Sequence, residues 1–255
     1  MGKLDQTLAA MQADAADDGA RLRFYADLAD AELVLLLEHE TTEGTIAPRI
    51  FDLDEGRVAL AFDGEERLAE VIGDSAPYVV LPGRVIAAGL AGQGVGLGLN
   101  LGAAAPSILL PADALAWLVD NLAVAPSAAR GQPTAFAAPD LPDPVLQALA
   151  DKLSRTGIAG ARLARVRYAD GTAGHLLALP GTPASAEAAL ARAVAEAVAL
   201  SGLPGLALDV VFPAPGDPVL SRMAGLSLEA RPLQVEPAPP PAAPGTDPAR
   251  PPRLK

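Results

Sequence analysis

The run of alternating glycines between residues 92 and 102 is the feature of the sequence that could bind a phosphate. Glycine-rich loops cradle phosphates with their backbone amides, and the dinucleotide-binding version has the spacing Gly-x-Gly-x-x-Gly. Counted from Gly92, however, Leu97 stands where the third glycine belongs, and no Gly-Lys-Ser/Thr follows. A dinucleotide loop also leaves a strand and enters a helix, whereas this run follows a predicted helix and enters a predicted strand. The sequence therefore argues against a phosphate loop.

The same run fits a strand with one side bare of side chains. Gly96 and Gly98 alternate with leucines, so another backbone or a helix could approach them closely. A groove for a ligand or a partner peptide is the alternative, and close packing is the favoured interpretation. If a ligand does bind, we expect its surface at Gly94, Gly96, Gly98 and Asn100.

Two acidic clusters have residue types that can hold a divalent cation. The segment Asp52-Leu-Asp-Glu-Gly56 is similar to a calcium loop, but its glycine comes one residue early and a strand follows. A turn accounts for it better. The group of Glu38, Glu40 and Glu43 around His39 is more typical of a solvated loop or strand edge. We therefore expect no metal site.

Nucleophilic and acid–base chemistry lack their usual residues. The chain has no Cys and no Gly-x-Ser-x-Gly nucleophile elbow. Its two histidines, His39 and His175, fall in different predicted domains, and His175 alternates with leucines as a half-buried structural residue would. Two carboxylates can share acid and base roles only if they converge in a pocket with separated pKa values, which spacing cannot show. We expect no catalytic residue and no cofactor.

Three arginines on one predicted strand make a small basic patch. Arg165 and Arg167 share a face of the strand at residues 161–168, and Arg162 lies nearby. A solvated sheet face is the default interpretation. The alternative is docking against the acidic first domain or against an acidic partner. Arg162, Arg165 and Arg167 therefore complete the candidate binding surface.

The charge balance excludes some partners. The 255 residues contain 31 Asp and Glu against 19 Lys and Arg, for a formal net charge of −12. Residues 1–125 hold 20 of the acids and 7 of the bases, whereas residues 126–255 hold 11 and 12. Because such a surface repels phosphates, we expect no nucleic-acid partner. The absence of Cys also excludes a disulfide framework.

One stretch is long enough for a membrane span. Residues 85–112 carry no charge, and a spanning helix needs about 20 apolar residues. Gln93, Asn100 and Pro106 interrupt the stretch, however, and its alternation of leucine with glycine has the period of a strand. The first residues include Asp5 and no apolar stretch, so we expect no secretory signal there. We expect a cytoplasmic protein with no membrane partner.

The elements that must position these residues predict an α+β protein of two domains, each a mixed or mainly antiparallel sheet packed with helices. The first domain spans residues 1–125. A capping box formed by Asp63 and Glu66 is expected to open one of its helices. Helices are expected at 4–11, 17–29, 63–72, 84–90 and 111–122, and strands at 33–37, 49–53, 57–62, 78–81, 95–101 and 108–110.

The second domain spans residues 143–231 in the order α, β, β, α, β. Asp170-Gly171 predicts a hairpin, and Arg192 and Glu196 are expected to pair on the solvent side of a long helix that opens at Thr182 and Pro183. A short last strand is predicted at 226–229. A Pro-rich linker, 126–142, precedes the domain, and a disordered Pro-rich tail, 232–255, follows it.

Several runs in the first domain resemble the SseB family, named for enhanced serine sensitivity. They are Ala20-Arg-Leu-Arg-Phe-Tyr, Phe51-Asp-Leu-Asp-Glu-Gly, Ala61-Phe-Asp-Gly-Glu-Glu-Arg-Leu-Ala, Tyr78-Val-Val-Leu-Pro-Gly-Arg, the glycine run, and Pro106-Ser-Ile-Leu-Leu-Pro-Ala-Asp-Ala-Leu-Ala-Trp-Leu. The second domain, through Leu208-Asp-Val-Val-Phe, resembles the family's C-terminal domain more weakly. The resemblance implies a cytoplasmic bacterial protein of two α/β domains, with no established catalytic residues to carry over.

The sequence as a whole predicts a binding protein, not an enzyme. A strongly acidic domain joined to a neutral one and to a Pro-rich tail suits an adaptor or regulator that acts on a protein partner. The name of the similar family suggests a partner in serine or sulfur amino-acid metabolism. The alternative is an amino-acid sensor, or an enzyme with an unconventional pocket.

Overall fold

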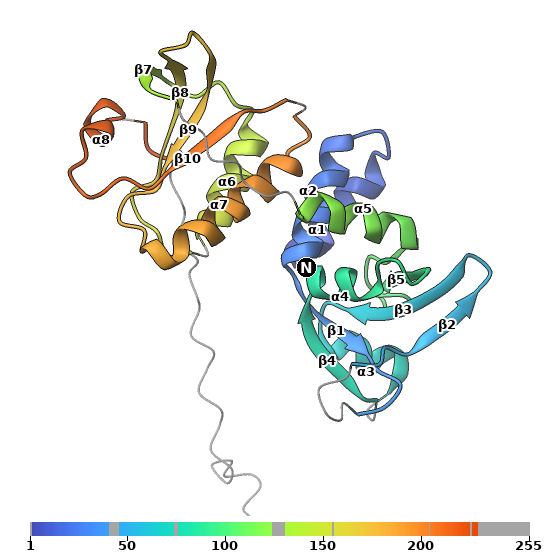
Figure 1. The fold of residues 1–255 in the computed structure, drawn as a ribbon. Coiled ribbons are helices and arrows are strands. Elements are labelled where there is room, and N and C mark those ends of the chain that lie inside the picture. The colour runs from blue at the N-terminus through green and yellow to red at the C-terminus, as the bar shows by residue number, and fades with distance from the viewer. Residues whose placement is uncertain are drawn as a thin grey trace, which may run out of the picture.

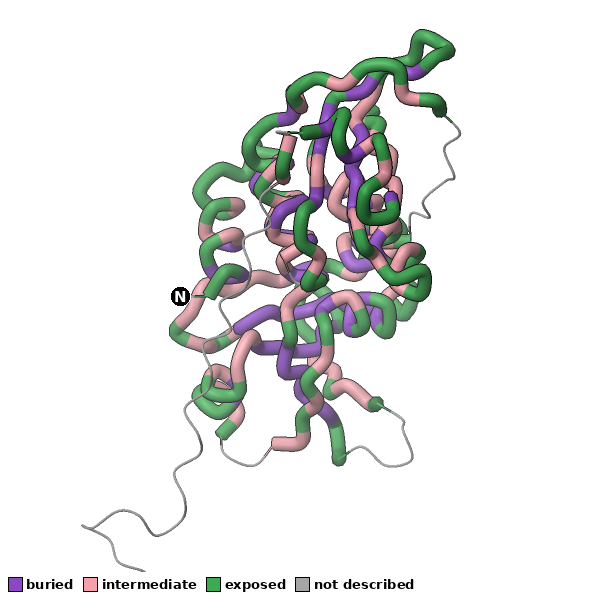
Figure 2. The backbone as a smooth tube through the Cα atoms, turned by 90° about the vertical axis from the view of Figure 1, so that its left-hand side faces the viewer, coloured by how far each residue is buried: buried purple, intermediate pink, exposed green. Residues whose placement is uncertain are grey.

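The computed structural model describes residues 2–40, 46–73, 76–123, 131–154, 156–203, 205–224 and 226–228. These residues fold into two domains, each built on its own sheet and its own hydrophobic core (Figure 1). Helices of the two domains face each other where the domains meet, and buried backbone is concentrated in the strands and inner helices (Figure 2). The expected α+β class is confirmed.

The first domain begins with two helices and then mixes strands with helices. Its helices are α1 (Lys3–Ala13), α2 (Asp18–Asp30), α3 (Glu65–Ile72), α4 (Gly83–Leu90) and α5 (Ala112–Leu122). Its strands are β1 (Glu32–Leu36), β2 (Ile50–Leu53), β3 (Gly56–Phe62), β4 (Tyr78–Pro82), β5 (Val95–Leu99) and β6 (Ile108–Leu110).

The first sheet is mixed and has a core on each face. Its strand order is β4-β1-β3-β5-β6, with β2 paired to the first part of β3 and with β3 and β5 parallel. Residues such as Leu33 and Leu97 pack against α1, α2, α4 and α5, while Val34 and Phe62 pack on the other face beside Leu68 of α3. Since alternate residues of a strand point to opposite faces, two cores explain why β1 is apolar almost throughout.

The second domain carries a four-stranded sheet in the order β10-β9-β8-β7. Its strands are β7 (Pro133–Ala137), β8 (Arg162–Tyr168), β9 (Ala173–Ala178) and β10 (Leu208–Val211), and its helices are α6 (Asp143–Ser154), α7 (Ala184–Ala199) and α8 (Pro218–Arg222). Helices α6 and α7 cover one face, and α8 packs on the other. The expected hairpin joins β8 and β9, with Gly171 at a φ of 87°.

The linker expected over residues 126–142 needs a correction. Residues 133–137 form β7, which pairs with β8 at the edge of the second sheet. Prolines suggested a linker, but an edge strand tolerates Pro133 because one side of it forms no ladder. Residues 126–130 of the expected linker and the Pro-rich tail, 232–255, lie outside the described residues. The strand expected at 226–229 is, over the described 226–228, a single bridge from Ser227 to Arg162.

Helix α3 begins later than the capping box predicts. Its N-cap is Gly64, not Asp63, and no side chain caps it. The Asp63 carboxylate instead lies 2.5 Å from Nη1 of Arg67, and the Asp63 amide donates to Asn100. An ion pair with Arg67, four residues along the chain, has therefore replaced the local cap.

Within the described residues, no helix is long and apolar enough to cross a membrane. The uncharged stretch at 85–112 lies mainly in α4, β5 and β6.

Candidate functional site

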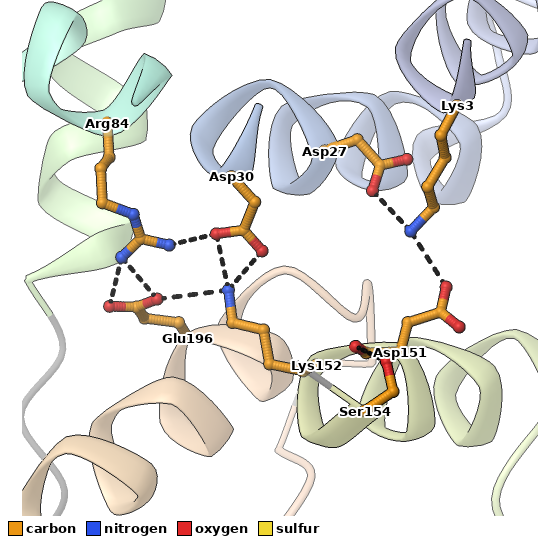
Figure 3. A network of polar contacts seen from close by, with 8 residues as sticks. All are labelled: Lys3, Asp27, Asp30, Arg84, Asp151, Lys152, Ser154 and Glu196. Atoms are coloured by element: carbon orange, nitrogen blue, oxygen red, sulfur yellow. Dashed lines mark hydrogen bonds and ion pairs between the residues drawn. The ribbon is translucent and has the colours of Figure 1, made fainter. Parts of the chain in front are cut away.

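Four helices bring four charged side chains together where the two domains meet (Figure 3). Asp30 ends α2 and Arg84 lies at the start of α4, both in the first domain. Lys152 lies on α6 and Glu196 on α7, in the second domain. Acid and base alternate around the set, which we call the interdomain charge ring.

Two of the contacts in the ring cross between the domains. Nη1 of Arg84 donates to both carboxylate oxygens of Glu196, at 2.9 and 3.1 Å, and Nη2 donates to Asp30 within its own domain. Nζ of Lys152 donates to both oxygens of Asp30, at 2.7 and 2.9 Å, and lies 3.6 Å from Oε2 of Glu196. Because two acids face two bases, the ring has no net formal charge.

The ring is largely removed from water. The Glu196 side chain is 5% exposed, and those of Asp30 and Lys152 are 18% exposed. Burial opposes ionisation of Asp30, but hydrogen bonds from Lys152 and Arg84 outweigh it and hold the pKa of Asp30 below its ordinary value. Burial likewise opposes the charge of Arg84, and its hydrogen bonds to Glu196 and Asp30 raise the pKa of Arg84. Asp30 and Arg84 therefore stay ionised near neutral pH.

The expected pair of Arg192 and Glu196 on the solvent side of α7 is wrong. Glu196 is buried against the first domain and contacts Arg84 and Lys152 instead. Arg192 is exposed and forms no ion pair with any residue that the structure describes. Spacing along one helix predicts an i,i+4 pair, but it does not reveal that a second domain covers that face.

A second ionic contact joins the domains beside the ring. Nζ of Lys3, in α1, lies 2.8 Å from Asp27 of α2 and 2.9 Å from Asp151 of α6. Partial burial opposes the charge of Lys3, but hydrogen bonds to both carboxylates raise its pKa. Figure 3 shows this contact next to the ring.

Clefts lie on both sides of the ring. The larger one, of about 710 Å³, is open and is lined by Pro82, Ser185 and Arg192 together with the ring. The smaller one, of about 200 Å³, includes Lys3 and Asp151 in its wall. Asp30, Lys152 and Glu196 line both, so the ring separates the two clefts.

A carboxylate pair with separated pKa values lies elsewhere in the first domain. Nη1 and Nη2 of Arg67 donate to Asp5 at 2.9 and 2.8 Å, and Arg67 also contacts Asp63. The hydrogen bonds from Arg67 lower the pKa of Asp5, whereas burial raises that of Asp63. Separated values can mark an acid and base pair, but here Arg67 occupies both carboxylates. We assign the cluster a structural role, holding α1 against α3.

Packing closes the glycine run. Every residue of β5 is buried. A Cβ at Gly96 would lie 2.5 Å from the carbonyl oxygen of Leu110, and one at Gly98 would lie 2.5 Å from Cδ1 of Leu101. Gly94 lies outside the strand, in the turn before it, at a φ of 66°. The surface expected at Gly96 and Gly98 is therefore not open to a ligand.

Asn100 is also used inside the first domain. It is 1% exposed and adopts a φ of 54°, which Asn tolerates better than most residues. Its Oδ1 accepts from the Asp63 amide at 3.2 Å, and its Nδ2 donates to the Pro106 carbonyl at 3.3 Å. Asn100 therefore closes the turn after β5.

The structure brings together two of the three candidate arginines. Arg165 and Arg167 are exposed on one face of β8, opposite Ala137 and Ala135 of β7. Arg162 lies on the other face, where it donates to the carbonyl of Leu220 in α8. We call the exposed set of Ala135, Ala137, Arg165, Arg167 and Ala173 the β7–β8 platform. The domains do not dock through it, because the contact between them uses α6 and α7.

The histidines remain apart. His175 is half-buried on β9, as expected, and its Nε2 lies 2.7 Å from Asp140, which also contacts Arg165 at 2.8 Å. His39 is exposed beside Glu38 and Glu40, and Glu43 lies outside the described residues. Over the described part of the chain, no group of His, Cys, Asp or Glu has the geometry to hold a metal ion.

Comparisons with known proteins bear on the first domain. No curated protein and no solved structure gives a significant match to the chain. The weaker resemblance of the second domain to the family's C-terminal domain stays a prediction. Residues 4–117 match the family model described as the SseB protein N-terminal domain, which places this acidic α+β domain in the SseB family.

Proposed function

We propose that this protein is a regulatory binding protein that acts through contacts with a protein partner and performs no reaction of its own. The observation that carries the proposal is the β7–β8 platform. It is an exposed part of the sheet face that α6 and α7 cover elsewhere, it bears two exposed arginines, and it lies beside a strand edge. In the charge clusters at the ring and at Arg67, by contrast, the charges serve contacts inside the chain.

The backbone of the platform suits an added strand. Among the described strands, β7 pairs only with β8, so its outer edge is free to pair with an extended segment. Arg222 donates to the carbonyls of Pro133 and Thr134 at 3.2 and 2.8 Å, which covers the first part of that edge. The part at residues 135–137 remains, above a shallow hollow of about 300 Å³.

The charge of the platform suits an acidic segment. Arg167 forms no ion pair with a described residue, and Arg165 pairs only with Asp140, each side chain being 53% exposed. An exposed pair of this kind contributes little to stability, so a partner's carboxylate can replace Asp140 at small cost. The small side chains of Ala135 and Ala137 leave both guanidinium groups accessible.

The test is affinity capture from the native cell extract with a charge-reversed platform. The variant R165E/R167E is compared with R21E/R49E, which makes the same change in net charge on the first domain. We expect the wild-type protein and R21E/R49E to retain one protein in stoichiometric amount, and R165E/R167E to lose it. A photo-crosslinking residue at position 137 should join the same protein. Equal retention by both variants would contradict the proposal.

The larger interdomain cleft favours a second candidate, an amino-acid sensor. Its wall carries Arg192, which forms no ion pair with a described carboxylate, together with Glu196 and Asp30 of the ring. A zwitterion needs both signs, a cation for its carboxylate and an anion for its ammonium group. The connection of the family's name with serine makes serine the first compound to test. Under this candidate, millimolar serine should raise the melting temperature of the wild-type protein and not that of Arg192→Gln.

A further inference from the structure

An aliphatic pocket opens at the end of the main core of the first domain. It has a volume of about 370 Å³ and lies between α4 and the β2–β3 hairpin. Leu35, Ile50, Leu81, Ile86, Leu90 and Val95 form its walls. Ile46 and Val85 stand at its mouth with 39% and 46% of their surface exposed. Its size lies at the lower end of the range for small-molecule sites.

A glycine of α4 forms part of the wall of this pocket. Gly89 lies on the exposed side of α4 and lines the pocket, and a Cβ built there would have no atom within 4 Å. A glycine inside a helix costs about 1 kcal/mol relative to alanine. Packing gives no reason for that cost at Gly89, because the space beside it is empty.

One cation stands at the pocket. Arg57 lines it and is exposed, and it forms no ion pair with any described residue of a domain in which acids far outnumber bases. Asp52 is its cross-strand neighbour in the β2–β3 pairing, and the two form no ion pair either. The other polar side chain of the wall, Gln93, donates its amide to the Gly89 carbonyl.

We propose that this pocket binds a free aliphatic monocarboxylate, with its chain against the apolar walls and its carboxylate on Arg57. The carboxylate supplies the partner that Arg57 lacks, and a bidentate contact between guanidinium and carboxylate fixes the orientation of the ligand. The aliphatic chain removes Ile46 and Val85 from water. The site lies in the first domain and does not depend on the β7–β8 platform.

The test uses hexanoate, octanoate and 1-octanol with the full-length protein in isothermal titration calorimetry. Each added methylene that enters the pocket should tighten binding about three- to fourfold. Octanoate should bind at least about tenfold more tightly than 1-octanol, because the alcohol cannot make the charged contact. Equal binding of acid and alcohol, no dependence on chain length, or no binding of octanoate at millimolar concentration would each overturn the proposal.

Variants separate the two halves of the site. Arg57→Gln should weaken octanoate binding about tenfold, while Arg49→Gln, the matched control on β2's flank, should leave it unchanged. Asp52→Asn should tighten binding, since it removes a competing negative charge. Gly89→Leu should abolish binding by filling the pocket without a lower melting temperature, whereas Gly89→Ala should retain it. Unchanged affinity in Arg57→Gln or Gly89→Leu would show that octanoate binds elsewhere. If a peptide with a free C-terminus bound the pocket more tightly than octanoate, the proposal of a free acid would be wrong and the ligand would be a protein C-terminus.

Discussion

The interdomain charge ring and the β7–β8 platform contain similar residues in opposite situations. In the ring, Arg84 and Lys152 face Asp30 and Glu196, and three of the four side chains are at most 18% exposed. On the platform, Arg165 has one exposed acidic neighbour and Arg167 has none among the described residues. Both regions contain charged side chains of both signs. Of the two regions, only the platform has arginines that remain exposed and available to bind another molecule.

The comparison teaches that pairing and burial, not residue type, separate structural charge from available charge. A buried ion must be paired, because removing an unpaired charge from water carries a large free-energy cost. An exposed arginine needs no partner inside the chain. Four variants or conditions test this distinction, and they are ordered by the size of the expected effect.

Removing one acid from the ring should have the largest effect. In Glu196→Ala, Arg84 loses its contact across the domain boundary and Lys152 loses a neighbour, and we expect a loss of about 3 kcal/mol in the free energy of unfolding. Urea denaturation followed by circular dichroism measures it. Arg192→Ala, one turn earlier on α7, should change the same quantity by less than about 0.5 kcal/mol. Similar losses in both would mean that the ring is not structural.

A substitution in the buried, uncharged glycine face of β5 should have the next largest effect on stability. Gly96→Ala places a methyl group against the backbone carbonyl of Leu110, which cannot move without disturbing the sheet, and should cost about 2 kcal/mol. Gly98→Ala meets the ends of two leucine side chains and should cost less. Thermal unfolding compares the two variants with Gly89→Ala. If Gly96→Ala is as stable as the wild type, the glycine face is open and the ligand-groove interpretation returns.

Acid should weaken the contact between the domains gradually. Because the pKa of Asp30 is lowered in the folded protein, its stabilising effect is complete above the ordinary value of 3.8 and is lost as the pH falls through the lowered value. Small-angle X-ray scattering from pH 7 to pH 3 should therefore show constant dimensions down to about pH 4 and expansion only below it. In Asp30→Asn the dimensions should no longer follow this profile. Expansion of the wild-type protein between pH 7 and pH 5 would exclude Asp30 as the cause.

The platform arginines should have the smallest effect on stability. Arg167→Ala should change the free energy of unfolding by less than about 0.5 kcal/mol, and Arg165→Ala by less than about 1 kcal/mol through its contact with Asp140. Urea denaturation of both variants is the measurement. A loss near that of Glu196→Ala would show that these arginines hold the fold together and are not free for a partner.

The sequence predicted local features better than contacts between distant segments. Alternation at Val95–Leu99 and the Asp170-Gly171 pair identified β5 and the β8–β9 hairpin, because strand period and turn chemistry are properties of neighbouring residues. The prolines in and near β7 suggested a linker and hid this strand. Proline has no backbone amide to donate, and only the sheet shows that β7 is an edge strand on which that amide is not needed. Asp63 does not cap α3 as predicted, because its carboxylate forms an ion pair with Arg67.

The ring escaped prediction for the same reason. Asp30, Arg84, Lys152 and Glu196 are spread over four helices and carry no shared spacing. These two acids and two bases can be recognised as one cluster only once the three-dimensional arrangement of the four helices is known. The arginine patch was half predicted, because strand alternation pairs Arg165 with Arg167 and also places Arg162 on the opposite face.

The alternating order of the ring has a consequence for how the domains find each other. Each domain presents one positive and one negative group side by side, so neither attracts the other through an overall excess of charge at this spot. If the second domain docked with these positions reversed, lysine would face arginine and glutamate would face aspartate. The observed orientation avoids that repulsion, so the ring disfavours docking of the two domains in the reversed orientation.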